Sequence, residues 1–383
     1  FHDLRSRGVG LLNSELPGSE HTGTGNDYRG WEFYKDTRVL YGSVRIGEKL
    51  FKHPVPSRMI WRPDKMVCEY EINGVLIREE KFIAANDAAV ARITSSQPVI
   101  LKFDGHSFFV RHSVSSTASI RYDEQSNAIL VTEGGTVKSL PDPDRRERIG
   151  PCVYQGMTTA LSASEDFSQS IQMKKDDRGV CQYSFEVPCD KKGVTVSWAM
   201  NDDQAKAREA SRSAIFQYEE MGVAKTREMN RLLSLQIPQF RCSDRKFEEI
   251  YYFLWSLYMM YYINVQKGWE MENHTQSAVN NFLGIHRYDA CFQIKVGAWT
   301  RDKPRFAYGN VLTWKHLVEN GRYRETPNGM IMLSDNKGIG WHSGAYGGEL
   351  AEHVLGAWQI YQHTNDIDFV RNCYEGYFRK VFW

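Results

Sequence analysis

The chain has 383 residues, which is enough for two domains with cores of their own. Its 48 basic and 47 acidic residues give a formal net charge of +1, so the strongly basic surface of a nucleic-acid or membrane-surface binder is excluded. No run approaches the ~18 apolar residues of a membrane-spanning helix. We therefore expect a globular protein without a nucleic-acid or membrane partner.

The seven cysteines show no spacing typical of metal ligands, and the nearest pair, Cys181 and Cys189, is eight residues apart. An odd number of scattered cysteines favours free thiols, although Cys181 and Cys189 could bridge a hairpin. The sequence predicts no metal and no cofactor, and it leaves the compartment open.

Residues 31–200 have the pattern of many short strands. Apolar and acidic side chains alternate over residues 68–72, and Asn73-Gly74 then turns the chain back into residues 75–83. An Asn-Gly pair between such segments predicts a hairpin, because both turn positions need positive φ. Further strand-like runs lie at 99–103, 108–114, 129–132, 183–187 and 194–200. This pattern predicts an antiparallel β-sandwich over residues 1–200.

A charged, helix-forming segment follows the strands. Asp202 or Asp203 can cap a helix that runs from about Gln204 to Leu233, and Pro238 lies shortly after its end. We expect residues 201–241 to form a connecting helix and a linker between two domains.

From Ser243, a candidate N-cap, the apolar period becomes helical. The helix expected over residues 243–265 is apolar on nearly all sides, which predicts burial on more than one face. Further helices are expected at 288–299, 303–319, 347–364 and 367–383. The loops 266–286 and 321–346 are longer than the connectors of compact domains, which indicates a function in this helical domain, residues 242–383.

Two segments carry residues suited to binding sugars. Arg287-Tyr288-Asp289 stands at a helix start, which would keep the Asp289 carboxylate ionised as an acceptor for hydroxyl groups. A helix cap paired with Arg287 explains the same residues equally well. Trp341 lies in a glycine-rich loop, where a large ring has no helical face to fill, so stacking on a sugar is favoured. His342 and Tyr346 belong to the same loop.

Glu349 follows Gly347-Gly348, a pair that would let the backbone approach a ligand closely. Glu349 could equally be a first-turn acid of the next helix. Glycoside hydrolysis needs two carboxylic groups, and Asp289 and Glu349 are the catalytic candidates, although their spacing cannot show that they face each other.

Three further tryptophans lie inside predicted helices: Trp299, Trp314 and Trp358. For these rings we expect packing in the core.

The order of these segments resembles the six-hairpin glycosidases, in which a β-sandwich precedes an (α/α)6 toroid. Trehalase, disaccharide phosphorylase and processing α-glucosidase branches are the most similar. Residues 284–292 (GIHRYDACF) resemble the Gly-x-x-x-Trp-Asp-x-x-x-Phe segment of the family, with Tyr288 in place of its Trp. Residues 340–349 resemble its Pro-Trp-x-Ser loop that ends in Gly-x-Glu. Residues 358–383 resemble the helices that end in Phe-Trp.

The resemblance implies a role for each matched residue. Arg287 and Asp289 would hold the sugar in the cleaved subsite, and Trp341 and Glu349 would line it; the change at Tyr288 leaves the identity of the sugar open. The family's general acid follows the helix that ends in Phe-Trp, so it would lie after Trp383. The predicted helices are too few to close a toroid, and we expect an incomplete first part of one, which a second chain or segment completes.

We interpret the chain as a glycoside hydrolase of the inverting type, acting on an α-linked glucoside or a related oligosaccharide. Its carboxylic groups would lie ~6.5–9.5 Å apart. A disaccharide phosphorylase, in which phosphate replaces water, is the near alternative. A polysaccharide lyase also uses a helical toroid but usually places its sandwich after it. A non-catalytic carbohydrate-binding or structural protein is the third class.

Overall fold

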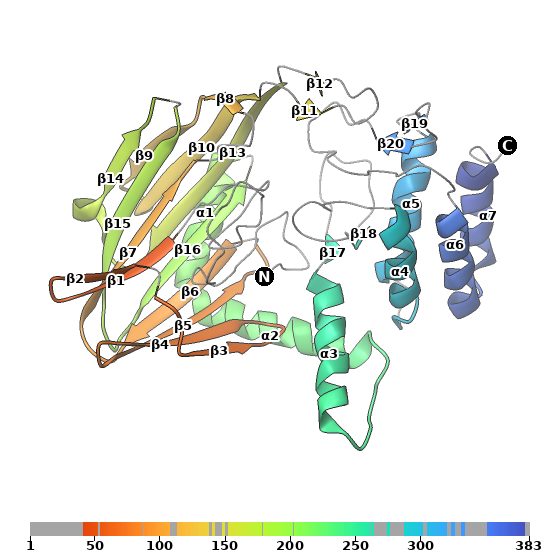
Figure 1. The fold of residues 1–383 in the computed structure, drawn as a ribbon, viewed down its shortest axis with the longest axis horizontal. Helices are drawn as coiled ribbons and strands as arrows, with labels where there is room; N and C mark the ends of the chain where they lie inside the picture. The colour runs from red at the N-terminus through yellow and green to blue at the C-terminus, as the bar shows by residue number, and fades with distance from the viewer. Residues whose placement is uncertain are drawn as a thin grey trace. The chain divides into compact units, whose positions relative to one another are not determined.

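The computed structural model describes a defined set of residues: 41–52, 54–86, 88–107, 113–137, 140–141, 148–149, 152–177, 179–201, 203–260, 262–263, 274–275, 287–301, 305–319, 323–325, 331–333 and 351–379. The described residues up to Arg227 form one compact unit, and those from Glu228 onward form another. The first unit consists mainly of strands and the second mainly of helices (Figure 1).

The first unit contains two antiparallel sheets. One has the strand order β14-β15-β7-β1-β2, and the other has the order β3-β4-β5-β6-β16-β13-β10-β8, with β9 also paired to β10. A short separate ladder joins β11 and β12. The strands are β1 (Tyr41–Ile46), β2 (Lys49–Lys52), β3 (Arg58–Trp61), β4 (Met66–Ile72), β5 (Val75–Ile83), β6 (Ala88–Ser95), β7 (Val99–His106), β8 (Ser113–Ser116), β9 (Ser119–Asp123), β10 (Ala128–Val137), β11 (Leu140–Pro141), β12 (Arg148–Ile149), β13 (Cys152–Ala163), β14 (Gln172–Lys175), β15 (Cys181–Cys189) and β16 (Val194–Asn201). An N-terminal antiparallel sandwich followed by helices is thereby confirmed.

The hairpin expected at Asn73-Gly74 is confirmed as the turn between β4 and β5. Both residues have positive φ, 51° for Asn73 and 78° for Gly74, and Ile72 pairs directly with Val75. This is the backbone that a two-residue turn needs to match the twist of its strands.

The core of the sandwich follows from the alternation of side chains along β15. Tyr183, Phe185 and Val187 are buried, whereas the residues between them are partly exposed. The ring of Phe185 lies 5.3 Å from that of Phe103 and 4.4 Å from that of Phe167, measured between centroids. These contacts place one face of β15 in the core and leave its other face towards solvent.

Neither Cys181 nor Cys189 forms a disulfide, and they stand at the two ends of the single strand β15. Eight residues of extended chain span ~26 Å, at ~3.3 Å per residue, so these thiols cannot bridge a hairpin. That expectation is wrong, because the residues between the cysteines continue one strand without a turn.

The helix expected from Gln204 to Leu233 is interrupted at Gln217, giving α1 (Gln204–Phe216) and α2 (Tyr218–Leu235). Asp203 caps α1 as predicted, and its carboxylate accepts from the backbone N–H of Ala205 at 2.9 Å and of Lys206 at 3.4 Å. The buried face of α1, formed by Ala207, Ser211 and Ala214, lies against the β16 sheet. Because α1 covers one face of β16 and the sandwich core covers the other, this strand is buried along nearly its whole length.

The second unit contains helices and two short strand pairs. The helices are α3 (Arg245–Met260), α4 (Arg287–Gly297), α5 (Arg305–Glu319), α6 (Ala351–Thr364) and α7 (Ile367–Cys373), which continues into the π-helical turn η3 (Tyr374–Phe378). The strand pairs are β17 (Tyr262–Ile263) with β18 (His274–Thr275), and β19 (Tyr323–Glu325) with β20 (Ile331–Leu333). None of the described helices is long and apolar enough to cross a membrane.

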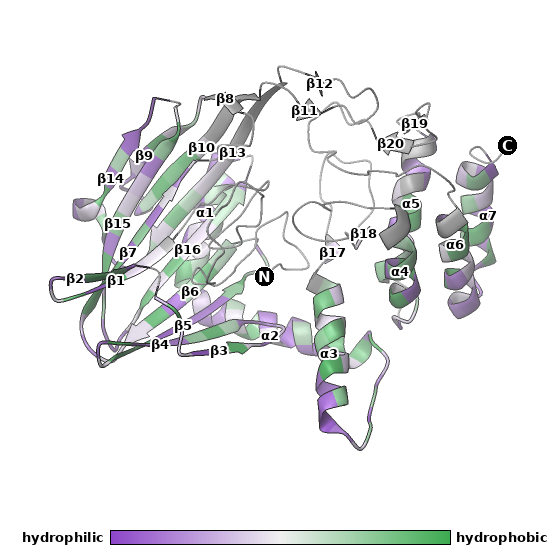
Figure 2. Cartoon of the chain, in the orientation of Figure 1, coloured by the Kyte–Doolittle hydropathy of each residue, from purple (hydrophilic) through white to green (hydrophobic). Residues whose placement is uncertain are grey.

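The first helix of this unit differs from expectation at its start and on its surface. The side chain of Asp244, rather than Ser243, accepts from the N–H of Lys246 at 2.9 Å. Burial on more than one face was expected, but Phe247 (62%), Ile250 (52%) and Leu254 (56%) are exposed. Hydrophobic residues therefore reach the surface of α3 (Figure 2).

Candidate functional site

The backbone places Arg287, Tyr288 and Asp289 in the first turn of α4, so the helix predicted after these residues is confirmed. Only their backbone is described. A carboxylate in the first turn of a helix is stabilised by the helix dipole, typically by ~0.3–1 kcal/mol. The other predicted site residues, Trp341, His342, Tyr346 and Glu349, lie outside the described residues.

Helices α4 and α6 pack side by side and run in the same direction. Ile294 of α4 contacts Gly356 of α6, where an added Cβ would lie 2.8 Å from Ile294 Cδ1. Further along the chain in each case, the ring of Trp299, two residues past the end of α4, lies 4.5 Å from that of His363 in the last turn of α6, between centroids. The second contact lies closer to the C-terminus than the first on both segments. Helices α4 and α6 are therefore parallel and begin at the same end.

Helix α5 and the α7–η3 segment repeat this arrangement. The ring of Tyr308 in α5 lies 4.3 Å from that of Phe369 in α7. Further along both, a Cβ on Gly376 would lie 2.6 Å from Lys315 Cε and 2.5 Å from Glu319 Oε1. These two elements are also parallel to each other.

Antiparallel hairpins link the first parallel pair, α4 and α6, to the second, α5 and α7–η3. The end of α4 meets the start of α5, since a Cβ on Gly297 would lie 3.0 Å from the backbone nitrogen of Ala307. The start of α6 meets η3, where His353 Nδ1 lies 3.0 Å from Tyr377 Oη. The second unit thus contains two successive helical hairpins, α4–α5 and α6–α7–η3, packed in the same orientation around one core.

The end at which α4 and α6 both begin is the candidate site. The first-turn N–H groups of an α-helix have no partner within the helix, and the positive end of the helix dipole lies there, so two helix N-termini at one end favour bound or fixed negative charge. His353 and Tyr377 are buried at this end, and the sequence analysis did not select them. In the sequence, His353 is visible only as a histidine near the start of an apolar helix. Sequence alone does not distinguish such a histidine from an ordinary surface residue.

A second residue that the sequence analysis missed is Asn310, which is fully buried in α5. Its side chain donates to Thr275 O at 2.8 Å and to Gln293 Oε1 at 3.0 Å, and it accepts from Thr275 N at 3.0 Å. Asn310 therefore ties the β17–β18 ladder and α4 to α5. The apolar neighbours of Asn310 in the sequence could have indicated a polar residue on a buried helix face. The sequence could not have identified its hydrogen-bond partners.

The prediction that Trp299 and Trp358 pack in the core is wrong. Their exposed fractions are 58% and 52%. Within the described part of the chain, each ring contacts one aromatic neighbour, His363 for Trp299 and Tyr361 for Trp358. The side chain of Trp314 lies outside the described residues. Trp299 lies two residues past the end of α4, and Trp358 lies on an exposed face of α6, so neither ring reaches the core.

The shifted pKa values of this unit belong to groups that burial keeps neutral. Burial raises the pKa of Tyr308 to about 12, and the Asp366 carboxylate that accepts its hydrogen bond at 2.9 Å adds to the shift. Burial likewise raises the pKa of Cys373 to about 12. Both groups therefore remain protonated and neutral at neutral pH. Among the described residues, no cluster of three or more histidine, cysteine or acidic side chains could hold a metal ion.

No protein-family model and no curated protein matches the sequence. A kojibiose phosphorylase structure from the human microbiome has a similar fold, with a TM-score of 0.53 and 9% identity over 88% of this chain. A family GH92 glycosyl hydrolase superposes with a TM-score of 0.47 and 9% identity, covering 100% of this chain and 61% of its own. The chain spans about half the length, 48%, of the phosphorylase. At this identity, the phosphorylase comparison shows a shared fold.

Proposed function

We propose that the chain is part of a carbohydrate-active enzyme, a glycoside hydrolase of the inverting type that acts on an α-linked glucoside or a related oligosaccharide. Its catalytic cleft lies at the end where α4 and α6 both begin. The observation that carries this proposal is the parallel packing of these two helices, fixed by the contacts of Ile294 with Gly356 and of Trp299 with His363.

The helix geometry supports Asp289 and Glu349 as the carboxylic pair. Asp289 belongs to the first turn of α4, and Glu349 precedes Ala351, the first residue of α6, by two residues. Because two residues of extended chain span at most ~7 Å, the proposal assigns Glu349 to the same end of the pair. Axes of packed helices lie ~8–10 Å apart, which is compatible with the ~6.5–9.5 Å between the carboxyl groups of inverting enzymes.

The remaining candidates supply binding. Arg287 and Asp289 hold sugar hydroxyl groups from the first turn of α4. Trp341, in the segment leading to α6, stacks on a sugar ring, with His342 and Tyr346 as further hydrogen-bonding groups.

We propose that further helices, from a second chain or segment, complete the helical barrel. The support is a set of exposed apolar side chains on four helical segments, which a larger ring would cover: Phe247, Ile250 and Leu254 on α3, Phe292 and Val296 on α4, Leu355 and Trp358 on α6, and Ile367 and Tyr374 on α7–η3. Apolar patches larger than a few hundred Å² are rare on monomers and mark interfaces.

A phosphorylase is the second candidate, favoured by the fold shared with the kojibiose phosphorylase structure. The two reactions differ only in whether water or phosphate attacks the anomeric carbon, so the same helix arrangement serves both. A non-catalytic sugar-binding protein is the third candidate.

One experiment separates the three. The complete protein, including the helices that close the barrel, is incubated with α-linked glucose disaccharides, with and without inorganic phosphate, and the products are followed by NMR. Release of β-glucose without phosphate supports the inverting hydrolase. Turnover only with phosphate, giving a sugar phosphate, replaces it with the phosphorylase. Sugar binding without any turnover would leave the non-catalytic class.

A further inference from the structure

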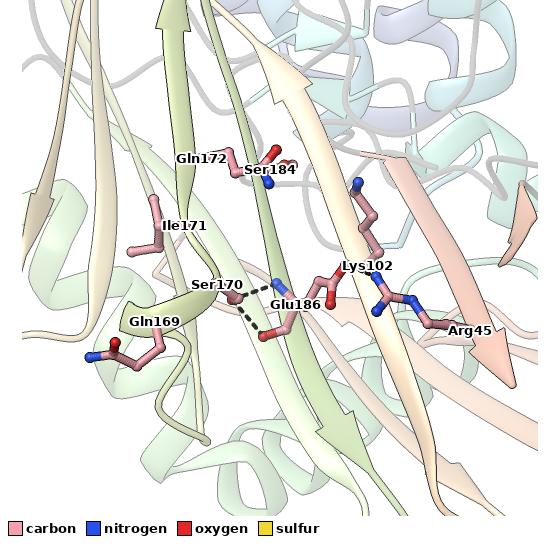
Figure 3. A pocket seen from close by; sticks show the side chains of 8 residues that line it. All are labelled: Arg45, Lys102, Gln169, Ser170, Ile171, Gln172, Ser184 and Glu186. Carbon is pink, nitrogen blue, oxygen red and sulfur yellow. Dashed lines mark hydrogen bonds and ion pairs between the residues drawn. The ribbon is translucent and has the colours of Figure 1, made fainter. Parts of the chain in front are cut away.

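The outer face of the β14-β15-β7-β1-β2 sheet carries an open hollow of about 470 Å³, far along the chain from the helices discussed above. Its lining comes from the four neighbouring strands β1, β7, β15 and β14 and from the segment with the turn η1 (Ser168–Ser170) that precedes β14: Arg45, Lys102, Gln169, Ser170, Ile171, Gln172, Ser184 and Glu186 (Figure 3). Small-ligand sites commonly measure ~300–1,000 Å³ and are mostly apolar. Here every lining side chain except Ile171 is polar, which favours a ligand rich in hydroxyl groups.

The wall of the hollow is fixed by hydrogen bonds. Ser170 Oγ accepts from the backbone nitrogen of Glu186 at 2.8 Å and donates to its carbonyl oxygen at 3.0 Å. These bonds attach η1 to β15. Glu186 in turn forms an ion pair with Arg45 across the sheet. The turn, the carboxylate and the guanidinium are therefore held in place before any ligand binds.

One cation in the hollow has no hydrogen-bonding or ionic partner among the residues that the structure describes. Lys102 stands directly opposite Glu186 in the β7–β15 ladder, but the Glu186 carboxylate pairs with Arg45 instead. Among the described residues, none forms a hydrogen bond or an ion pair with the Lys102 ammonium group. Figure 3 shows this side chain extending away from Arg45 and Glu186. The hollow thus offers one uncompensated positive charge.

Neutral groups surround that charge. Gln169, Gln172 and Ser184 line the hollow, and their side chains form no hydrogen bond with another described residue. Amide and hydroxyl groups donate and accept at once, as sugar hydroxyl groups require. None of the described residues that line the hollow is aromatic, so its contacts suit the hydroxyl groups at the edge of a sugar ring rather than the apolar face of the ring.

We propose that this hollow is a binding site for an acidic saccharide, with a uronic acid carboxylate on Lys102 and sugar hydroxyl groups on Gln169, Gln172 and Ser184. The site belongs to the β-unit and is independent of the function proposed for the helical unit. Because the hollow is open along the sheet, it accepts an internal sugar of a chain as well as a terminal one.

The test is isothermal titration calorimetry of the full chain with two disaccharides, glucuronosyl-glucose and glucosyl-glucose. We expect the acidic disaccharide to bind at least about tenfold more tightly, because a hydrogen bond to a charged group is the stronger kind. Lys102→Met should reduce this preference to less than about twofold. Lys174→Met is the matched control, since Lys174 lies on the same face of this sheet, in the edge strand β14, is exposed, and does not line the hollow.

Two further measurements control for loss of folding and for binding at the proposed catalytic end. Thermal unfolding of Lys102→Met should match the wild type, so that lost binding is not lost folding. Binding of the acidic disaccharide should persist in Asp289→Asn, which alters only the proposed catalytic end. Equal binding of both disaccharides, absence of binding, an unchanged preference in Lys102→Met, or loss of binding in Asp289→Asn would each overturn the proposal.

Discussion

Ile294 of α4 lies against the backbone of Gly356 in α6, so closely that a Cβ on Gly356 would stand 2.8 Å from Ile294 Cδ1. Both residues belong to the buried interface between the two helices. The missing side chain at position 356 lets the helices approach, and their approach brings residues 287–289 and the start of α6 to one end. The proposed cleft therefore depends on one glycine.

Gly356→Ala and Ile294→Val should be energetically coupled. Ile294→Val alone should lower the free energy of unfolding by about 0.5–1.5 kcal/mol, because it removes a buried methyl group. In the Gly356→Ala background, Ile294→Val also removes the Cδ1 atom that clashes with the new Cβ. There it should lower the free energy of unfolding by at least about 0.5 kcal/mol less than in the wild type. Chemical denaturation of the four proteins measures the difference. Equal costs in both backgrounds would show that the helices are not in this close contact.

Asp289→Asn should weaken sugar binding by about 1.5–3 kcal/mol, since a carboxylate held at a helix start is a stronger acceptor than an amide. Titration calorimetry with the substrate of the complete protein measures the loss. Asp368→Asn is the matched control, because Asp368 also lies in the first turn of a helix, α7, and is exposed. Unchanged affinity in Asp289→Asn would reduce Asp289 to a helix cap.

The chain of residues 1–383 should self-associate when it is produced without the proposed completing helices. Phe247, Ile250 and Leu254 expose apolar surface along one helix, and such surface is removed from water by association. Replacing all three with Gln should shift the population towards monomer in light scattering after size-exclusion chromatography. A monodisperse wild-type monomer whose helical unit unfolds cooperatively would argue against an incomplete barrel.

Asp64 should contribute to stability at neutral pH but not in acid. Burial raises the pKa of Asp64, but the hydrogen bond from Thr226 at 2.6 Å and the ion pair with Arg62 at 2.9 Å outweigh it, so the pKa lies below its ordinary value. A lowered pKa stabilises the folded state above the unfolded pKa of about 3.9, and this contribution is lost as the pH falls through the folded value.

The wild type should therefore be more stable than Asp64→Asn at pH 7, and the difference should shrink as the pH falls below about 4. Denaturation curves from pH 7 to pH 3 measure it. The exposed Asp177→Asn should differ from the wild type by less than about 0.5 kcal/mol throughout. A difference between wild type and Asp64→Asn that is constant with pH would exclude an electrostatic origin.

Local features of the fold were predictable where one short segment contains all the interacting groups. Asn73-Gly74 specifies its turn through the φ angles of two adjacent residues, and Asp203 caps α1 through N–H groups two and three residues away. The helices after residue 243 follow from apolar periodicity in the same way.

Other features depend on partners that are distant in sequence. Ser197 and Ser211 are buried together, with their hydroxyl oxygens 2.8 Å apart, because α1 folds back over β16. Trp299 and Trp358 have large aromatic side chains of the kind that is common in protein cores. Their exposure depends on which helices lie beside them. For the candidate site, the sequence indicated the groups and the helix starts, whereas the parallel packing that relates α4 to α6 required the structure.

The position of β16 has a consequence for the order of events during synthesis. This strand is the last of its sheet to leave the ribosome, yet it lies in the middle, between β6 and β13. Until residues 194–201 emerge, β3 to β6 and β8 to β13 cannot join, and β6 and β13 are open edges that can pair with other chains. We therefore expect a nascent chain stalled before Val194 to depend on chaperones, and one released after α1 to close its sheet without them.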